Sequence, residues 1–418
     1  MSDAAIEEML DVLVLTTEPI KHDRRVRAQI AELEARGLSV DAVEIPVTAA
    51  PRIDVRVVVR AFACVLRTFC RAFAGLPQLY RFCHEYRLGE YPTTRIPLFG
   101  CFARDVWNPL VNGIMHERRV ARERKHALII ANDLQALIYA MGCTRNTTPI
   151  IYDSHEFNLH RRRKNAWIRI FWIYAFESCG VLRSSLTIVV GEGVRDALAK
   201  LYGNIPLEVM PNAFYVRSGV VQDSIPTLQH GVHLVYVGAC VSGRSLDLLL
   251  ELLGMNVGIT ASLFIIGKVG AEYEGRLSSP NLRAYYGQDY AGRLCEVVSE
   301  HPCVFSWCVI EDVCLSYRLA SPNKYYQSIA LGIPVLVNSD QWLSGVVERD
   351  GNGLVIPAEL TRKPAQLARW MVQRAVDGEY PCIRSKAQEM QGQYRTYPEY
   401  FASIAKGFHC RVSIKNGG

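Results

Sequence analysis

The sequence predicts an α/β protein made of two doubly wound domains, each with a parallel sheet covered by helices on both faces. Three observations support this fold class. Short apolar runs alternate with helical stretches along most of the 418 residues, as in chains that form parallel sheets. The alternation breaks once, at 213–231, and then resumes. A chain of this length also suggests two or three domains, with cores large enough to need no staples.

The first half of the chain supplies the first set of alternating elements. The apolar run 12–16, VLVLT, is typical of a buried strand, and 23–36 follows with helical spacing until Gly37 ends the helix. After a long basic stretch the same pattern returns several times. Further strands are expected at 39–44, 126–133, 149–156, 186–190 and 206–210, with helices at 134–142, 166–183 and 194–202.

The second half supplies another alternating set. Strands are expected at 233–238, 261–266, 303–306 and 334–338, with helices at 244–253, 289–299, 323–331 and roughly 385–406. We therefore divide the chain into a first domain, 1–212, a linker, 213–231, and a second domain, 232–384. Residues 385–418 are expected to form a C-terminal helix and tail that pack back on the first domain. Ligands of such sheets bind at the carboxyl ends of the strands, and a cleft between two domains is the default site.

Composition narrows the protein class. Half of the residues are apolar and about a fifth are charged, an ordinary globular balance. The thirteen cysteines include no C-x-x-C pair, and Cys303, Cys308 and Cys314 have no common zinc-ligand spacing. The acidic start, MSDAAIEEML, is unlike a signal peptide, and the apolar run 168–176 is too short to span a bilayer. These features predict a cytoplasmic protein with reduced thiols.

The net charge of +6 is unevenly distributed. Residues 52–125 hold fourteen Lys or Arg against six Asp or Glu, and 161–164 read RRRK. The arginines alternate with apolar and aromatic residues, which suits an anionic membrane surface at the inner face of the membrane. Solvated helix faces would give the same composition. Nucleic acid could use the same charge, but no recognised nucleic-acid motif occurs, so we expect no nucleic-acid partner.

Five sequence motifs follow one another along the chain: VLVLTTEPIKHDRRV, IYDSHEF, LTIVVGEGVRDALAKLYG…VMPNA, VYVGACVSGR and SPNKYYQSIALGIPV. Together they resemble the motifs of family 4 glycosyltransferases. The resemblance covers most of the chain, with a gap at about 50–125. It implies the GT-B fold: two Rossmann-like, doubly wound domains facing across a cleft. It also implies that a nucleotide-sugar binds mainly the C-terminal domain and that a glycan or lipid-linked acceptor binds mainly the N-terminal one, with retention at the anomeric carbon.

The last motif predicts where a diphosphate would bind. A diphosphate needs backbone N–H groups at a helix start and one or two cations. Ser321 is a plausible N-cap and Pro322 fits the first turn, with Lys324 following in that turn. Arg244, after a Gly-rich turn, is implied as the second cation, although a surface lysine and a solvated arginine are the plain alternatives. The implied donor-binding residues are Gly238, Arg244, Ser321, Pro322, Asn323, Lys324 and Gln327.

Gln327 departs from the family, which has a glutamate there to accept hydrogen bonds from ribose hydroxyls. An amide oxygen can still accept such a bond, at a cost of about 1 kcal/mol relative to a carboxylate. An earlier family glutamate is replaced by Leu319. Gln327 could instead face solvent, or the chain could be a catalytically decayed scaffold or partner subunit.

Residues of the first domain are implied at the transfer site. His155 is the catalytic candidate, since it follows a strand and the family histidine contacts the donor sugar; a capping or core histidine is the alternative. Asp23, Arg25 and Glu156 are candidates for acceptor or phosphate contacts, against a helix cap and a surface arginine. Zinc is disfavoured because His155 and His160 are five residues apart and would not share a helix face.

No D-x-D sequence occurs, which fits a metal-independent scheme in which the helix dipole and cations neutralise the leaving group. We therefore predict a retaining, metal-independent glycosyltransferase of polysaccharide or other polymer-precursor biosynthesis, with no cofactor. A nucleotide-sugar 2-epimerase on the same fold is an alternative, but it would need several carboxylates and histidines in the cleft. The sequence names neither the sugar, the nucleotide base nor the acceptor.

Overall fold

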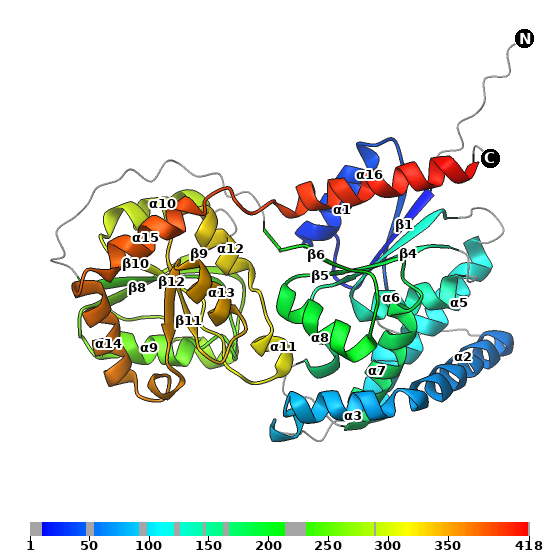
Figure 1. Ribbon diagram of the computed structural model, residues 1–418, viewed down its shortest axis with the longest axis horizontal. Helices are drawn as coiled ribbons and strands as arrows, with labels where there is room; N and C mark the ends of the chain where they lie inside the picture. The colour runs from blue at the N-terminus through cyan, green and yellow to red at the C-terminus, as the bar shows by residue number, and fades with distance from the viewer. Residues whose placement is uncertain are drawn as a thin grey trace, which may run out of the picture. The chain divides into compact units, whose positions relative to one another are not determined.

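A computed structural model describes the chain at residues 11–46, 54–91, 98–120, 126–144, 148–161, 167–213, 231–287 and 290–416. The protein divides into two compact units (Figure 1). Unit 1 comprises Met1–Met210, Cys314–Ser316 and Tyr397–Gly418, and unit 2 comprises Pro211–Val313 and Tyr317–Thr396. The predicted linker, 213–231, lies outside the described residues except at its two ends.

Unit 1 is built on a parallel six-stranded sheet of order β2-β1-β3-β4-β5-β6. Its central strands are buried on both faces, which explains why they read as continuous apolar runs. The strands are β1 (Asp11–Thr16), β2 (Ser39–Glu44), β3 (Leu128–Asn132), β4 (Ile150–Ser154), β5 (Leu186–Val189) and β6 (Leu207–Val209).

Helices cover both faces of this sheet. Figure 1 shows α1 and α16 on one face and α6 and α7 on the other, with α2 and α5 packed outside that second layer. The helices are α1 (Arg24–Glu34), α2 (Val55–Ala74), α3 (Leu76–Glu85), α4 (Leu98–Phe102), α5 (Asn108–Val120), α6 (Asp133–Cys143), α7 (Trp167–Val181), α8 (Glu192–Tyr202) and α16 (Tyr397–Asn416). A π-helical turn, Ala103–Trp107, joins α4 to α5.

Unit 2 repeats the architecture with a parallel sheet of order β12-β11-β10-β7-β8-β9. The strands are β7 (Val232–Cys240), β8 (Ile259–Val269), β9 (Leu282–Tyr286), β10 (Val304–Trp307), β11 (Val335–Asn338) and β12 (Gly353–Ile356). The helices are α9 (Leu246–Gly254), α10 (Ala291–Glu300), α12 (Asn323–Ala330), α13 (Leu343–Asp350), α14 (Pro364–Val376) and α15 (Glu379–Glu389). The short helix α11 (Leu315–Arg318) is divided between the two units.

The central strand β7 shows how both faces of the second sheet are packed. Leu234 and Tyr236 lie in the apolar cluster formed with α9 and α14. Val235 and Val237, which point the other way, pack with α10. This alternation buries both faces of β7, so unit 2 is doubly wound like unit 1 and the predicted α/β class is confirmed.

The predicted strands match ten of the twelve observed strands to within a few residues, and the exceptions are the edge strands β9 and β12. The single helix expected over 385–406 is wrong. The chain forms α15 and α16 instead, separated by a segment in which Gly392 has a φ of 77°. A left-handed residue cannot continue a right-handed helix, and Pro398 then sits near the start of α16, where its missing N–H costs nothing.

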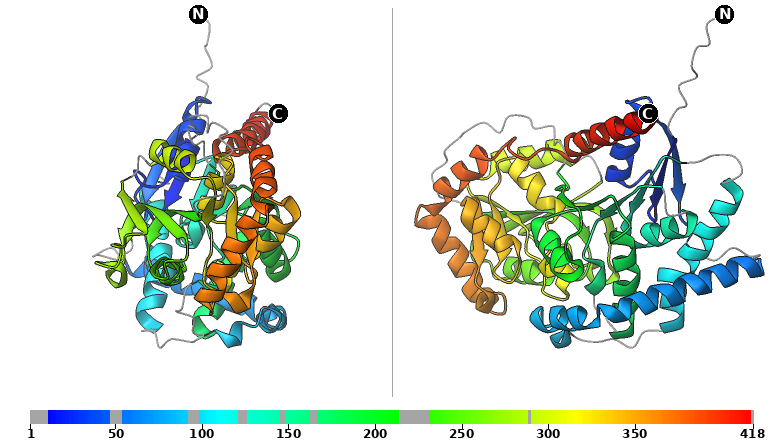
Figure 2. Two further views of the ribbon diagram at one scale, coloured as in Figure 1. Left: turned by 90° about the vertical axis from the view of Figure 1, so that its left-hand side faces the viewer. Right: turned by 45° about the vertical axis from the view of Figure 1, so that its right-hand side comes forward.

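Helices in the described part of unit 1 occupy the basic stretch 52–125. Figure 2 shows α2 as a long helix along the outside of the unit. Among the described helices of the chain, none has both the length and the mean hydropathy required to cross a bilayer.

Candidate functional site

The tip of α12 in unit 2 holds a buried cation without a hydrogen-bond partner among the described residues. The helix begins at Asn323, and its N-cap is Pro322, with extended backbone. The predicted cap is therefore wrong by one residue, because the Ser321 hydroxyl is committed to Tyr326, 2.6 Å away. No side chain caps the helix, so the first backbone N–H groups of α12 lack a side-chain acceptor.

Lys324 lies in the first turn of α12, but it is not a surface lysine. Its side chain is only 6% exposed, and Nζ has no hydrogen-bond partner among the described residues. The ammonium lies 4.7 Å from the centre of the Tyr236 ring, a cation–π contact. Burial and the charge of Arg244 lower the pKa of Lys324 to about 7, and Cys308 only partly offsets this shift. Such a group favours an anion as its missing partner.

Arg244 supplies a second cation next to Lys324. It follows Gly243, which has a φ of 90° and sits against the ring of Tyr317. The Arg244 guanidinium carbon lies 5.3 Å from the centre of that same ring, on a partly exposed side chain. Its charge helps to lower the pKa of Lys324, and no carboxylate is among the causes of that shift. The structure therefore brings together the two cations that the sequence predicts.

The other predicted donor-binding residues lie in β7 and in or just before α12. Gly238, in β7, has a φ of 148°, and an added Cβ would come within 3.2 Å of the Tyr236 hydroxyl. Asn323 is exposed at the first position of α12, and Gln327 is partly buried one turn after Lys324. Leu319, at the position of the family's earlier glutamate, is buried. The contact of Gln327 with a ribose stays a prediction.

A second cluster lies in unit 1, at the carboxyl ends of β3 and β4. His155 follows β4, and its side chain is 21% exposed. Its Nδ1 lies 3.7 Å from an oxygen of Asp133, and its Nε2 lies 3.7 Å from Oδ2 of Asp153. Burial disfavours the charged imidazole, but the carboxylates of Asp133 and Asp153 outweigh it and raise the pKa of His155. His155 is thus a polarised, partly accessible histidine rather than an apolar core residue.

Asp133 is the site residue that the sequence analysis missed. It starts α6 directly after β3 with a φ of 71°, a left-handed conformation that costs an aspartate of the order of 1 kcal/mol. Its side chain is buried, and Oδ1 has no hydrogen-bond partner in the described part of the chain. The signal was its position: Asp133, like His155, comes just after a strand of the same sheet.

The three residues predicted to contact acceptor or phosphate, Asp23, Arg25 and Glu156, each bind other groups of the protein. Asp23 caps α1, because its Oδ1 accepts from the backbone N–H groups of Arg25 and Val26. Arg25 does not face solvent: it is 3% exposed and forms an ion pair with Asp153 at 2.6 Å. Glu156 pairs with Arg161 at 2.6 Å. Asp23 and Arg25 therefore stabilise the structure around the site, whereas an acceptor contact by Glu156 stays a prediction.

The two histidines considered for zinc, His155 and His160, make different contacts. His160 is fully buried, and its Nδ1 accepts a hydrogen bond from the backbone N–H of Leu315 at 3.0 Å. Within the parts of the chain that the structure describes, no group of three or more His, Cys, Asp or Glu side chains is placed to hold a metal ion.

Comparisons with known proteins place the fold. No protein-family model matches the sequence, and no curated protein matches it. Solved structures do match. Sucrose-phosphate synthase from Thermosynechococcus elongatus is 12% identical, with a TM-score of 0.63 over 97% of this chain and 100% of that one. An α,α-trehalose 6-phosphate synthase from Burkholderia multivorans is 11% identical, with a TM-score of 0.57 over 98% of both chains.

A third structure, HepE from Anabaena in complex with UDP, is 12% identical, with a TM-score of 0.56 over 96% of this chain and 100% of that one. At such low identity the likeness concerns the fold and not the activity. The two parallel six-stranded sheets with their covering helices agree with it. The chain therefore has the two Rossmann-like domains of the GT-B fold, which these glycosyltransferases share.

Proposed function

We propose that this protein is a retaining glycosyltransferase that takes a sugar from a nucleotide-sugar and needs no metal ion. The observation that carries the proposal is the pair of cations at the tip of α12. Lys324 is buried with no hydrogen-bond partner among the described residues, and Arg244 adds its charge nearby. Two cations and a helix N-terminus with unoccupied N–H groups form a complementary site for a diphosphate.

The energetics of Lys324 support a binding role over a decayed scaffold. An ammonium held in a buried position without a counter-ion destabilises the protein, which is why the pKa of Lys324 falls to about 7. A bound diphosphate would remove this penalty, because it supplies the opposite charge and the missing acceptors. A scaffold that no longer binds a donor would gain stability by losing this lysine.

The proposed reaction uses the leaving diphosphate itself. The acceptor hydroxyl attacks the anomeric carbon on the face that the β-phosphate oxygen leaves, so the new glycosidic bond forms as the bond to that oxygen breaks. The hydroxyl proton passes to the departing phosphate oxygen, and the configuration is retained. Lys324, Arg244 and the N-terminus of α12 stabilise the charge that develops on the diphosphate.

His155 and Asp133 are proposed to orient the sugar. Both present polar atoms at the ends of neighbouring parallel strands, β4 and β3. Asp133 Oδ1 has no hydrogen-bond partner in the described residues, so it can accept a bond from a sugar hydroxyl. A protonated His155 would also donate to a sugar or phosphate oxygen. Gln327 is proposed to accept a bond from the ribose.

A nucleotide panel tests this function. The HepE neighbour was solved with UDP and glucose, so UDP and UDP-sugars are the first probes, followed by GDP and its sugars. A ligand at 100 times its Kd should raise the free energy of unfolding by about 2.7 kcal/mol. Lys324→Met should remove this stabilisation, and Lys363→Met, which changes an exposed lysine of the same unit, should preserve it. No stabilisation by any nucleotide, or a new epimer formed without acceptor, would refute the proposal.

We further propose that α2 holds the protein on an anionic membrane, at the cytoplasmic face, where a lipid-linked or other polymer precursor would be the acceptor. One face of α2 packs in the unit, and the opposite face carries large apolar side chains spaced three, four or seven residues apart, hence in one stripe. The stripe consists of Val55, Val59, Phe62, Leu66 and Phe73, with exposed fractions of 74%, 62%, 63%, 55% and 58%.

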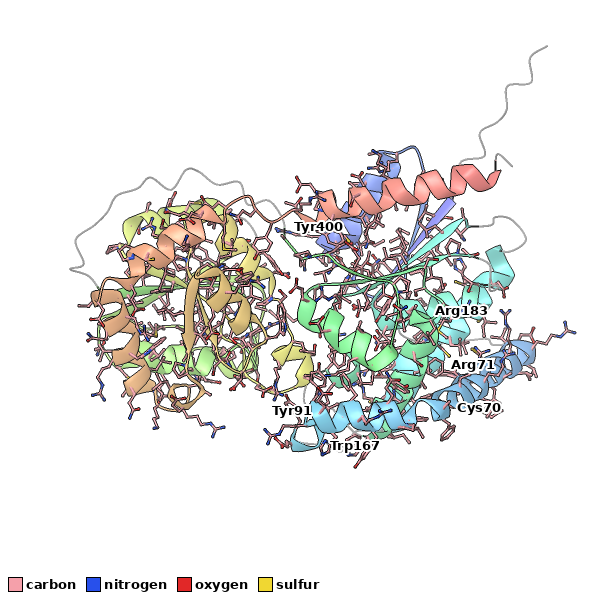
Figure 3. The ribbon with its side chains drawn as sticks, in the orientation of Figure 1. Cys70, Arg71, Tyr91, Trp167, Arg183 and Tyr400 are labelled. Atoms are coloured by element: carbon pink, nitrogen blue, oxygen red, sulfur yellow. The ribbon has the colours of Figure 1, made fainter. Side chains whose placement is uncertain are left out.

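Arginines follow one edge of this stripe. Residues 56, 60, 67 and 71 are all arginine, and they share one side of the helix by their spacing. Figure 3 labels Arg71 on α2, together with Cys70. The stripe spans about 27 Å along the helix. An apolar stripe with a basic edge matches the interface of an anionic bilayer, in which the apolar side chains enter the acyl boundary and the exposed Arg56, Arg67 and Arg71 meet lipid phosphates. Arg60 is half-buried and forms an ion pair with Glu117.

Flotation with liposomes tests this surface. The protein should float with vesicles of mixed phosphatidylglycerol and phosphatidylcholine at physiological salt, and less with phosphatidylcholine alone. A double change, Phe62→Ser with Leu66→Ser, should abolish flotation. Val376→Ser, at an exposed apolar residue of unit 2, should not. Flotation that survives the double change, or a concentration-dependent dimer that the double change dissociates, would overturn the membrane assignment.

A further inference from the structure

A buried polar network connects the C-terminal helix to the strand that carries His155. Its centre is Asp153, the fourth residue of β4, which is fully buried. The Asp153 carboxylate accepts from Arg25 at 2.6 Å, from Gln29 at 3.0 Å and from the hydroxyl of Tyr397 at 2.8 Å. Burial alone would raise the pKa of Asp153, but Arg25 and His155 outweigh it and keep the pKa below its usual value. Asp153 is therefore an ionised carboxylate in the interior of unit 1.

Tyr397, at the first position of α16, is held in one orientation. It is fully buried, and the Arg25 guanidinium carbon lies 4.4 Å from the centre of its ring. The amide nitrogen of Gln29 directs one N–H to Asn132. Its other N–H is shared between the Tyr397 oxygen, at 2.7 Å, and Oδ2 of Asp153, at 3.0 Å, while the phenol donates to Asp153. Gln29 is fixed in turn by two hydrogen bonds between its side-chain amide and that of Asn132, one in each direction and each 3.0 Å long. Figure 1 shows α16 lying along α1, which carries both Arg25 and Gln29.

The phenol and the imidazole meet at the same oxygen. Oδ2 of Asp153 accepts from Tyr397 and also lies 3.7 Å from Nε2 of His155. The charged and titratable groups that face His155 are Asp133, at the start of α6, Asp153, on β4, and Arg25, on α1. Tyr397, on α16, acts on His155 only through Asp153. A hydrogen bond to a carboxylate oxygen withdraws negative charge from it and weakens its attraction for a neighbouring proton.

We propose that Tyr397 is a positioning residue for the transfer site, because its hydroxyl holds Oδ2 of Asp153 and so sets how strongly that carboxylate draws on His155. The inference rests on the proposed role of His155. Under this proposal the C-terminal helix α16 contributes to the transfer site, although Tyr397 follows Asp153 by 244 positions in the sequence. A helix that only covered the sheet would leave the proton affinity of His155 unchanged.

The direction of the effect follows from the geometry. Removing the Tyr397 hydroxyl leaves Oδ2 with more negative charge, and this charge stabilises the protonated imidazole. The pKa of His155 should therefore rise in Tyr397→Phe, by about 0.5 to 1 pH unit, a three- to tenfold increase in proton affinity. The protonated histidine would then persist to higher pH, and the alkaline limb of the kcat profile should move by the same amount.

An NMR titration of the full chain, labelled at its histidine rings, measures this without any substrate. His155→Gln identifies the His155 resonance among the ten histidines. Tyr397→Phe is compared with Tyr202→Phe, which likewise removes a phenol that donates to a buried carboxylate, Glu177, at 2.7 Å. We expect the pKa of His155 to rise in Tyr397→Phe and to stay at the wild-type value in Tyr202→Phe.

The results separate clearly. An unchanged His155 titration in a folded Tyr397→Phe protein, or an equal shift in both variants, overturns the inference. If Tyr397→Phe does not fold, 3,5-difluorotyrosine at position 397 replaces it: the more acidic phenol donates more strongly, so the pKa of His155 should fall, and a rise or no change overturns the inference. A shifted titration in a protein that binds no nucleotide would support this coupling while refuting the proposed function.

Discussion

Replacing Lys324 with methionine should stabilise the free protein while it removes donor binding. The methionine fills a similar volume against Tyr236 but carries no charge, so it removes the cost of a buried ammonium. The fall of the Lys324 pKa from 10.5 to about 7 corresponds to roughly 5 kcal/mol of unfavourable environment for the charged form. Because replacements of buried charges recover only part of such a cost, we expect a gain of about 1–3 kcal/mol.

The gain depends on pH in a defined direction. The folded pKa of Lys324 lies below the unfolded value, so the unfolded chain binds the extra proton between these two values. The destabilisation by Lys324 is therefore fully present below about pH 7 and declines as the pH rises toward 10.5. The stabilising effect of Lys324→Met should be largest near pH 6 to 7 and should shrink steadily above it.

Thermal unfolding measures both effects. A unit of this size shifts by about 2–4 °C for each kcal/mol, so unit 2 should melt several degrees higher in Lys324→Met at pH 7. Because two units need not unfold in one step, the transition of unit 2 is compared between variants rather than converted to a single free energy. Lys363→Met is the matched control. Wild-type stability at every pH, together with an unchanged nucleotide response, would show that Lys324 is not a buried cation awaiting an anion.

Other consequences of the account can be measured on the same protein. Nucleotide affinity, measured by calorimetry, should weaken about tenfold per pH unit above pH 7, because binding must return a proton to Lys324, and an affinity that does not change with pH would contradict this role. Arg244→Met should raise the Kd for a nucleoside diphosphate tenfold or more, while a nucleoside without phosphates binds as to the wild type; equal losses for both would place Arg244 away from the diphosphate. Gln327→Glu should preserve or improve kcat/KM for the nucleotide-sugar, and a tenfold loss would exclude the ribose contact. Asp133→Asn, which keeps the shape of the side chain, should lower the pKa of His155 in an NMR titration, and an unchanged value would separate the two residues.

The strands buried on both faces could be predicted from the sequence because they form continuous apolar runs. The two that escaped prediction, β9 and β12, are edge strands. β9 carries Arg283 in its second position, and β12 starts with a glycine, so neither reads as an apolar run. The helices over 52–125 were not resolved as elements because their apolar residues lie on two opposite faces of α2, which blurs the helical period.

The cations of the site could be predicted because a single motif and a single turn contain them. What the sequence could not show was that Lys324 is buried, since a lysine at a helix start is ordinarily solvated. The hydrogen-bond network around Asp153 could not be predicted from the sequence either. Its members come from β4, α1 and α16, and only the folded sheet brings Tyr397 within hydrogen-bond distance of Asp153.

The most direct test is a crystal structure of the full chain with a nucleoside diphosphate, UDP or GDP, whichever the panel shows to bind. We expect the β-phosphate to lie within hydrogen-bond distance of Lys324 Nζ and of the first N–H groups of α12, with Arg244 beside it. A diphosphate bound elsewhere, with Lys324 still buried and without an anion, would contradict this expectation.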